Sequence, residues 1–312
     1  MAKIICGVDV SSERLDARIG LEGAELSVER TAGGVGRLLG FCRQHGVELV
    51  VLEATGGYEK LAFSLLWAEG QACAIANPRA VRRLAESLGL LEKTDRIDAG
   101  VIARYGEVKG LVGQAPASAA QQKLRALVTR LGQLTALKTA QSNQRRLVED
   151  AEVLASIDEV LALARRQIRR LEVAIASLLD QDPLWQALDE TFRSIKGVAD
   201  RTTARLMAEL PEIGQVSNKA IAKLAGLAPM AKDSGKRRGK RSIRGGRSAV
   251  RSTLFIVAEV VRRHNPDFAD LHHRLTQAGK PKRAVRVALA RKLLVRLNAK
   301  ARDQRAAWSL AA

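Results

Sequence analysis

Four acidic residues near the N-terminus have the types and spacing of a metal site, beginning with two at the ends of predicted strands. Asp9 lies near the end of the apolar run 4–10, Glu53 ends the run 47–53, and turn-forming residues follow both. Acids are disfavoured in strands, and a charge beside a buried strand is costly without a partner. We therefore expect both side chains near the carboxyl ends of their strands, where open α/β sheets bind ligands.

Asp95 and Asp98 add a second pair of carboxylates. Their i, i+3 spacing places both on one face of a predicted helix, roughly 5–6 Å apart at Cβ. Taken alone, they are better explained as first-turn acids that interact favourably with the helix dipole. Together with Asp9 and Glu53 they predict four carboxylates around one point, which repel one another unless a cation compensates them. Mg²⁺ or Mn²⁺ suits such oxygen ligands, and two such ions can flank a phosphodiester during in-line displacement.

Residues 1–110 alternate between short apolar runs and amphipathic segments, and these elements must position the acids. We predict strands at 4–10, 15–19, 26–30, 47–54 and 73–76, and helices at 35–45 and 58–69. Asn77-Pro78 stops the last strand and opens another helix. Strands that alternate with helices predict an α/β domain with a partly parallel sheet.

Residues 111–190 are predicted to form a helical arm. Between 119 and 179 the chain has no proline and a single glycine, Gly132. A similar apolar pattern begins at Leu124, and the second half follows the unbroken 3,4 spacing of a coiled-coil seam: Leu154, Ile157, Leu161, Ala164, Ile168, Leu171, Ile175 and Leu178. The seam fits an antiparallel hairpin within one chain as well as an arm for oligomerisation. We expect a homodimer or higher homo-oligomer built partly on it.

The net charge of +19 is concentrated at the end of the chain. Residues 191–312 carry 28 Lys and Arg against 8 Asp and Glu, a net of +20, whereas 1–110 have a net of −1 and 111–190 a net of 0. Charge gathered in one domain indicates a polyanionic partner, and nucleic acid fits better than an anionic membrane or an acidic protein. The stretch 232–251 has too few apolar residues to form a core and is predicted to be a loop or arm that orders on its ligand. Helices are predicted at 219–226, 248–263 and 283–298.

The remaining composition bounds the class of protein. Cys6, Cys42 and Cys73 are isolated and odd in number, which indicates buried thiols rather than a disulfide framework or a zinc site. We expect no secretory signal, because the first residues run straight into a short apolar strand, and the longest apolar run, around 254–261, is too short to span a membrane. We expect a cytoplasmic, nucleoid-associated protein of a prokaryote, without a membrane partner.

The acids and the C-terminal motifs together resemble one family. Asp9, the segment 53–56 (EATG) and the segment 93–99 (KTDRIDA) look, in this order, like the DEDD motif of RuvC-like transposases of the insertion-sequence one-ten family, to which the Piv DNA invertases are related. Residues 227–229 (LAP), Ser234-Gly235, Gly239 and the basic helix from Ser248 are similar to that family's second transposase domain. The resemblance covers nearly the whole chain and keeps the order of the motifs.

The resemblance implies the fold and the reaction. It implies an RNase H-like (RuvC-like) α/β domain at 1–110, a coiled-coil arm at 111–190 and a mostly helical basic transposase domain at 191–312. Asp9, Glu53, Asp95 and Asp98 would hold Mg²⁺ or Mn²⁺. The implied activity is site-specific recombination of DNA, guided in at least part of the family, the RNA-guided bridge recombinases, by a structured RNA from the element.

The resemblance also assigns a serine nucleophile to Ser234. A serine hydroxyl is a poor nucleophile unless a base or metal activates it and cations stabilise the phosphorane charge. No histidine lies nearby, so activation would have to come from the metal site. From local chemistry alone Ser234 is better explained as a linker residue, and Ser242 or Ser248 fits equally well. The cations expected to hold nucleic-acid phosphates are Lys232, Lys236, Arg237, Arg238, Lys240, Arg241, Arg244 and Arg247.

A further phosphate contact is predicted at Gly197. The segment 195–199 (IKGVA), with a predicted helix after it, looks like a helix-hairpin-helix, in which glycine amides hold a DNA phosphate at a helix N-terminus. The family pattern has a second glycine where this chain has Ala199, and a purely structural hairpin fits equally well.

These features favour a DNA recombinase or transposase of an insertion sequence, and two alternatives are open. One is a Holliday-junction nuclease of the RuvC type, which needs only the four acids and should tolerate loss of Ser234. The other is an architectural DNA-binding protein, which should be indifferent to loss of Asp9.

Overall fold

A computed structural model of the chain describes residues 3–90, 95–231, 233–235, 239 and 241–311, with residues 95–97 and 311 described by their backbone alone. The chain divides into two compact units, Met1–Ala117 and Ser118–Ala312. Each unit has hydrophobic cores of its own. Within the described residues, no helix is both long and apolar enough to cross a membrane.

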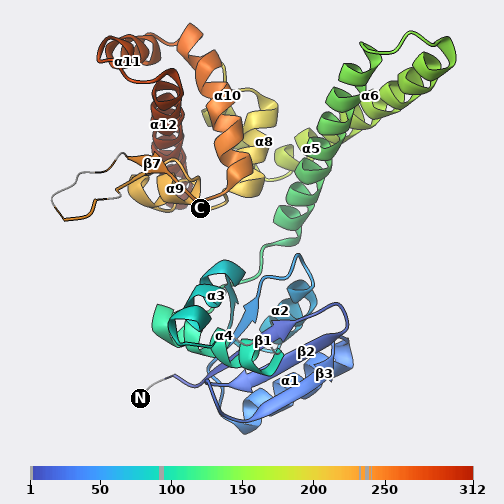
Figure 1. Cartoon of the computed structure of the whole chain (residues 1–312), viewed down its shortest axis with the longest axis vertical. Coiled ribbons are helices and arrows are strands. Elements are labelled where there is room, and N and C mark those ends of the chain that lie inside the picture. The colour runs from blue at the N-terminus through green and yellow to red at the C-terminus, as the bar shows by residue number, and fades with distance from the viewer. Residues whose placement is uncertain (1–2, 91–94, 232, 236–238, 240, 312) are drawn as a thin grey trace. The chain divides into compact units, whose positions relative to one another are not determined.

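The first unit is built on a five-stranded mixed sheet (Figure 1). Its strands lie in the order β3-β2-β1-β4-β5. Strands β1 to β3 pair antiparallel, and β1, β4 and β5 pair parallel. The bounds are β1 Ile5–Val10, β2 Arg14–Ile19, β3 Glu25–Glu29, β4 Leu49–Glu53 and β5 Cys73–Ala76. All five predicted strands are present, with ends that differ by one or two residues.

Helices cover both faces of this sheet, because its strands alternate apolar residues on two sides. On β4, Val50 and Leu52 join the core with α1 (Ala32–Gln44) and α2 (Glu59–Ala68). Leu49 and Val51 join the opposite core, with α3 (Pro78–Ser87) and α4 (Asp95–Lys109). As predicted from Asn77-Pro78, α3 starts there, and the Asn77 side chain accepts a hydrogen bond from the Arg79 amide. The three free cysteines are buried, also as predicted.

The second unit begins with an antiparallel hairpin of two long helices, α5 (Ala119–Arg145) and α6 (Ala151–Asp180). Ser118 and Asp150 cap their N-termini, and the bidentate pair of Arg145 with Asp158 ties the two helices together near the turn. Most of the predicted seam is buried, at Ile157, Leu161, Ala164, Ile168, Ile175 and Leu178. The seam therefore forms the antiparallel hairpin within one chain, which was one of its two predicted uses.

The rest of the second unit is a helical bundle whose core continues into the base of the hairpin. It contains α7 Pro183–Arg193, α8 Asp200–Glu209, α9 Asn218–Leu224, α10 Ser248–His264, α11 Pro266–Gln277 and α12 Lys282–Ala311. Leu124 and Ile168 of the hairpin share one core with Phe192, Leu254 and Leu293.

Two sequence predictions for this bundle are corrected. The last helix does not end at 298 but continues to Ala311, since Ala301 is buried and Arg305 donates to the Ile213 carbonyl. The stretch 232–251 contains a short strand that was not predicted, and it ends in the helix that was predicted from Ser248. A two-stranded ladder of β6 (Pro229–Met230) and β7 (Ser242–Ile243) closes it, and α10 occupies its end.

Candidate active site

The strand register places Asp9 and Glu53 next to each other. Strands β1 and β4 pair parallel with Val8 opposite Leu52, so one residue further along both strands Asp9 lies opposite Glu53. Neighbouring strands are about 4.8 Å apart. Side chains alternate along a strand, so both acids are on the face of Gly7 and Val51, which is the face that α4 covers. Both acids are partly buried.

Helix α4 runs antiparallel to β1 and so directs its first turn toward these acids. A Cβ atom on Gly7 would lie 2.1 Å from the Ala99 carbonyl oxygen and 2.4 Å from the Ala103 amide nitrogen. One turn further along α4, a Cβ on Gly106 would lie 2.8 Å from Val51 and 3.3 Å from Ile5. The helix therefore passes over β1 from its carboxyl end to its amino end. This close crossing requires glycine on both elements.

Asp95 and Asp98 lie in the first turn of α4, at the carboxyl end of β1. Asp95 is the first residue of the helix, and its side chain lies outside the described residues. Asp98 is partly buried, next to the fully buried Ala99. Asp9, Glu53 and Asp98, with the backbone of Asp95, thus lie at one edge of the sheet, on two parallel strands and the helix that crosses them.

The turn after Glu53 is fixed by a single carboxylate. Glu59 accepts hydrogen bonds from the Thr55 amide at 3.1 Å and the Gly57 amide at 2.9 Å. Gly56 and Gly57 have φ angles of 75° and 119°, a backbone conformation that favours glycine. These contacts hold the end of β4, and with it Glu53, in a defined place.

A divalent cation fits the chemistry of this edge, although no preformed cage is present among the described side chains. No three described His, Cys, Asp or Glu side chains are gathered closely enough to hold an ion, and Asp95 is not among them. The donors are nevertheless all carboxylates, which hard divalent cations prefer. Two residues after Glu53, the Thr55 hydroxyl is buried without a hydrogen-bond partner in the described part of the chain. A buried polar atom of this kind indicates a missing ligand or water.

Sequence reasoning missed a fifth acid at this edge, Asp16. It lies on β2, directly opposite Asp9 in the antiparallel ladder. The tight turn between β1 and β2 is the feature of the sequence that would have indicated Asp16. Asp9 and Asp16 lie on either side of the tight turn that joins β1 to β2, and pairing outward from Val10 and Leu15 matches the two acids.

Ser234 lies in the second unit, in the loop between β6 and β7. Its side chain is exposed and Gly235 beside it has a φ of 52°. The neighbouring Asp233 accepts hydrogen bonds from Arg241 at 2.6 Å and from the Gly239 amide at 2.9 Å. These hydrogen bonds hold the pKa of the Asp233 carboxyl below its usual range. Asp233 is therefore a weak base that already accepts two hydrogen bonds, so among the described residues it is not the group that would activate Ser234.

Of the predicted phosphate-binding cations the structure describes three, Arg241, Arg244 and Arg247, and phosphate binding stays a prediction for all eight. Five of them, Lys232, Lys236, Arg237, Arg238 and Lys240, lie outside the described residues. Arg241 pairs with Asp233, and Arg247 makes a bidentate pair with Glu212 at 2.5 and 2.6 Å. Arg244 is exposed. Gly197 has a φ of 99°, and a Cβ there would lie 3.0 Å from the Val261 amide nitrogen, so packing on α10 favours glycine here and the phosphate contact stays a prediction.

Comparison with known proteins matches both halves of the chain to transposases. Residues 6–157 match a transposase family defined by the DEDD domain, and residues 189–273 match the family described as "Transposase IS116/IS110/IS902 family". The chain is 31% identical over 260 residues to the pilin gene-inverting proteins of Moraxella lacunata and Moraxella bovis, covering 78% of this chain and 77% of each relative. It is also 31% identical over 153 residues to an uncharacterised IS110 protein of Streptomyces coelicolor, covering 48% of this chain and 37% of that protein.

This chain belongs to the IS110 transposase family. The transposase therefore has an RNase H-like N-terminal domain, which is the five-stranded sheet with its helices, followed by a mostly helical part. Its family consists of phosphoryl-transfer enzymes that recombine DNA. The DEDD domain implies the use of a divalent metal, and DNA is the implied partner.

Proposed function

We propose that this transposase cuts and rejoins DNA at specific sites with two groups of residues: a Mg²⁺ or Mn²⁺ site of Asp9, Glu53, Asp95 and Asp98, and the nucleophile Ser234. The observation that carries the proposal is the register of β1 and β4, with α4 crossing them antiparallel, because it brings three separate sequence segments to one edge of one sheet. The bound metal would neutralise phosphate charge and lower the pKa of an attacking hydroxyl.

The chain's own residues have distinct tasks in this reaction. The Ser234 oxygen forms a bond to phosphorus while the bond from phosphorus to one deoxyribose oxygen breaks. The serine hydroxyl gives up its proton, and the leaving oxygen takes one up. The phosphoserine link conserves the energy of the phosphodiester, so a hydroxyl of another strand can reverse the step and rejoin DNA. The cations of the 232–247 loop would hold the phosphate, and the exposure of Ser234 leaves it accessible to a strand.

Two finer features belong to the same proposal. A structured RNA would guide the choice of site, as the family resemblance implies, and the +20 charge of residues 191–312 would serve RNA as well as DNA. The transposase would act as a homodimer or larger homo-oligomer, with Ser234 and the acids able to come from different protomers. Because two relatives carry the name pilin gene-inverting protein, inversion between two sites in one DNA is the reaction to test first. Sequencing the nucleic acid that copurifies with the protein would identify the RNA and the sites.

The decisive experiment traps the protein–DNA link. The transposase is incubated with a DNA substrate that carries its sites and with Mg²⁺, then denatured, and the peptide attached to DNA is mapped by mass spectrometry. We expect the adduct on Ser234, and its complete loss in Ser234→Ala. Ser242→Ala, in the paired strand β7, is the matched control and should retain the adduct. Asp9→Asn should lose the adduct and keep DNA binding within about twofold, because the positive charge lies in the other unit.

The other outcomes favour the alternative functions. Cleavage that persists in Ser234→Ala without an adduct would support a hydrolytic nuclease of the RuvC type. Binding and bending of DNA that are unchanged in Asp9→Asn, with no cleavage by the wild type, would support an architectural protein.

A further inference from the structure

Asp16 is one of the two inner members of a polar row that crosses the sheet. The antiparallel ladders pair Ser27 on β3 with Asp16, and Asp16 with Asp9. Continuing the parallel register from Val8 and Leu52 adds Glu53 on β4. Three carboxylates on adjacent strands therefore lie in one row, each about 4.8 Å from the next strand. Like charges directly opposite each other in a ladder are destabilising.

The face of Asp16 is fixed by its neighbours in the strand. Leu15 and Ala17 are buried in the core that contains α1. Because side chains alternate, Asp16 lies on the other face, which carries Asp9 and is crossed by α4. The row is therefore on the side of the sheet where the first turn of α4 brings Asp95 and Asp98.

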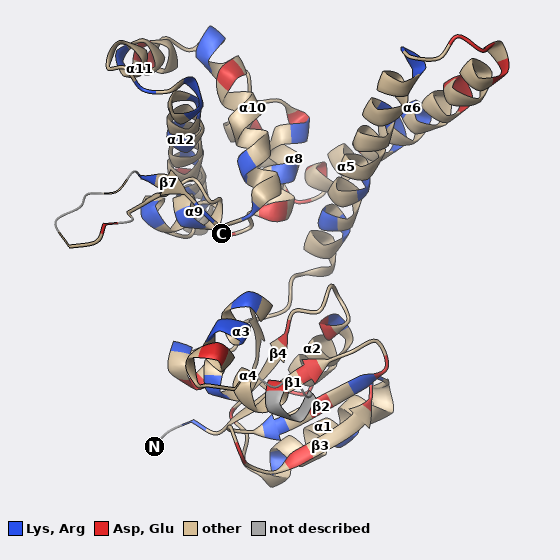
Figure 2. Cartoon of the chain, in the orientation of Figure 1, with Lys and Arg blue, Asp and Glu red and all other residues tan. Residues whose placement is uncertain are grey.

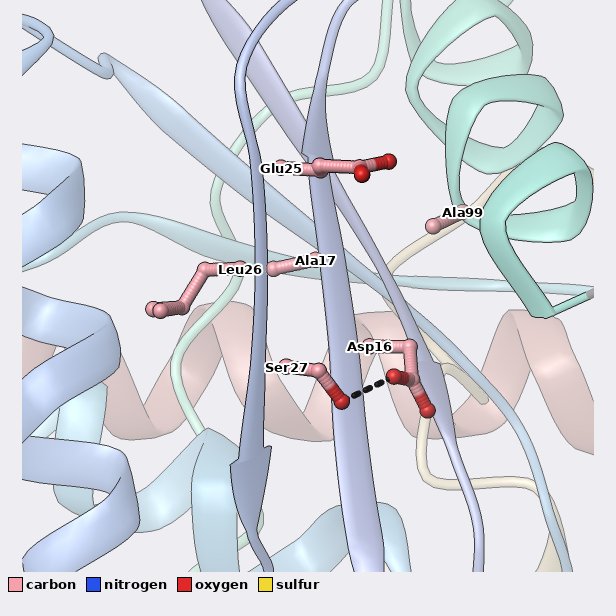
Figure 3. A pocket seen from close by; sticks show the side chains of 6 residues that line it. All are labelled: Asp16, Ala17, Glu25, Leu26, Ser27 and Ala99. Atoms are coloured by element: carbon pink, nitrogen blue, oxygen red, sulfur yellow. Dashed lines mark hydrogen bonds between the residues drawn. The ribbon is translucent and has the colours of Figure 1, made fainter.

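A hydrogen-bond chain holds the Asp16 carboxylate in place. Arg14 donates to the Ser27 hydroxyl oxygen at 2.6 Å, and that hydroxyl donates to Asp16 Oδ1 (Figure 3). Since the arginine occupies a lone pair of Ser27, the serine proton is directed to Asp16. Ser27 is the hydrogen-bond partner that the described residues give Asp16, and it uses a single carboxylate oxygen.

The space in front of Asp16 is hollow. A cavity of about 160 Å³ is lined by Asp16, Glu25 and Ser27 from the sheet and by Ala99 from α4 (Figure 3). Ala99 directly follows Asp98 in the first turns of α4. Ala17 and Leu26 also line the cavity, which is therefore partly apolar, and its size leaves room for several water molecules beside the polar side chains. It lies between the anchored carboxylate and the helix turn that carries two of the metal-site acids.

We propose that Asp16 is a fifth carboxylate of the metal site, a positioning residue that accepts hydrogen bonds from water molecules on the ion held at Asp9. The proposal rests on the metal site proposed above. The four acids together already balance the charge of two divalent ions. A fifth carboxylate is therefore better placed to accept hydrogen bonds from bound water than to contact an ion directly. Partners of this kind tune metal affinity by about 10- to 100-fold. The Arg14–Ser27 chain would keep the acceptor oriented while the ion enters.

The test measures Mn²⁺ binding to the full-length protein without DNA, by titration calorimetry, together with the melting temperature with and without Mn²⁺. Asp16→Asn keeps the size of the side chain and an oxygen for Ser27 but removes the charge. We expect it to weaken Mn²⁺ binding about tenfold and to raise the melting temperature of the metal-free protein, because repulsion with Asp9 is relieved. Asp16→Glu, which keeps the charge, should restore part of the affinity. Glu25→Gln, from the same cavity but outside the row, should change the affinity less than twofold.

The controls separate two failures. If Asp9→Asn abolishes Mn²⁺ binding while Asp16→Asn leaves it unchanged, the metal site stands and the role of Asp16 is overturned. A melting temperature that falls in Asp16→Asn with unchanged affinity also overturns that role and makes Asp16 purely structural. If Asp9→Asn also binds Mn²⁺ normally, the proposed metal site itself is wrong, and the role of Asp16 with it.

Discussion

At the scale of single residues, Arg247, a cation expected to bind phosphate, also forms an ion pair with Glu212 that holds the fold. Glu212 lies between α8 and α9, and Arg247 directly precedes α10, with its amide bonded to the Leu224 carbonyl. Burial raises the pKa of Glu212, but the bidentate hydrogen bond and the charge of Arg247 outweigh it, so the pKa is lowered on balance. The pair closes the base of the loop that carries Ser234.

Glu212→Gln should therefore destabilise the second unit by about 1 kcal/mol at neutral pH, a modest value because both side chains are about one third exposed. A carboxylate whose pKa is lowered on folding contributes stability that is fully present above its ordinary pKa. That contribution is lost as the pH falls through the lowered value. Chemical denaturation of wild type and variant between pH 3 and 7 should show a constant gap at neutral pH that closes on acidification. A gap independent of pH would contradict this role.

At the scale of elements, the α5–α6 hairpin uses its coiled-coil seam within one chain. Leu161 is 2% exposed, whereas Leu163 on the outer face of the same helix is 49% exposed. Val153 and Val160 are also exposed on α6. A homodimer built on this arm would have to use such outer side chains, because the seam is already filled.

This division predicts opposite results for two substitutions. Leu161→Ala leaves a cavity in the seam, should cost about 2–5 kcal/mol and should lower the melting temperature with the oligomer mass unchanged. Leu163→Glu should leave the melting temperature nearly unchanged and should lower the mass, if the arm forms the homodimer. Circular dichroism and sedimentation velocity measure the two quantities. An unchanged mass in Leu163→Glu would remove this face of the arm from the interface.

At the scale of the whole molecule, charge and metal chemistry are segregated between the two units. Residues 118–312 have a net charge of +20 and residues 1–117 a net of −1. In Figure 2, Lys and Arg recur along the helices of the second unit, with the acids of the first unit spread over its sheet and helices. Substitutions in the first unit should therefore affect the metal-dependent reaction, and substitutions of cations in the second unit should affect the binding of nucleic acid.

Salt should reveal this segregation. Each phosphate contact contributes a slope of about −0.9 to the plot of log affinity against log salt, so five or more contacts predict a slope steeper than about −4. The fragment 118–312 should keep most of the affinity and the slope of the full chain, and the fragment 1–117 should bind weakly. Filter binding over a range of NaCl concentrations measures both. A slope near zero would contradict an electrostatic interface.

The strands, the helical arm and the charge distribution of this protein could be predicted from its sequence, because each depends on residues close together in the chain. Alternation of apolar residues and turn residues predicted all five strands of the sheet, and the strand ends indicated Asp9 and Glu53. The seam predicted the arm, since a 3,4 repeat depends only on helix geometry. The net charge of 191–312 is a property of composition alone.

Other features were decided by the tertiary structure, because they depend on which distant segments pack together. Strand register placed Asp16 opposite Asp9, and no spacing in the sequence fixes register before the hairpin turn is known. The direction of α4 follows from the close approach of Gly7 to Ala99 and of Gly106 to Val51, contacts between residues roughly 50 to 100 positions apart. Within this chain the apolar seam of α6 packs against α5. A helix of a second chain would bury the same kind of apolar face, so the seam pattern alone does not distinguish the two partners. Folding also brought Glu212 to Arg247, and a count of charges does not predict which acid pairs with which base.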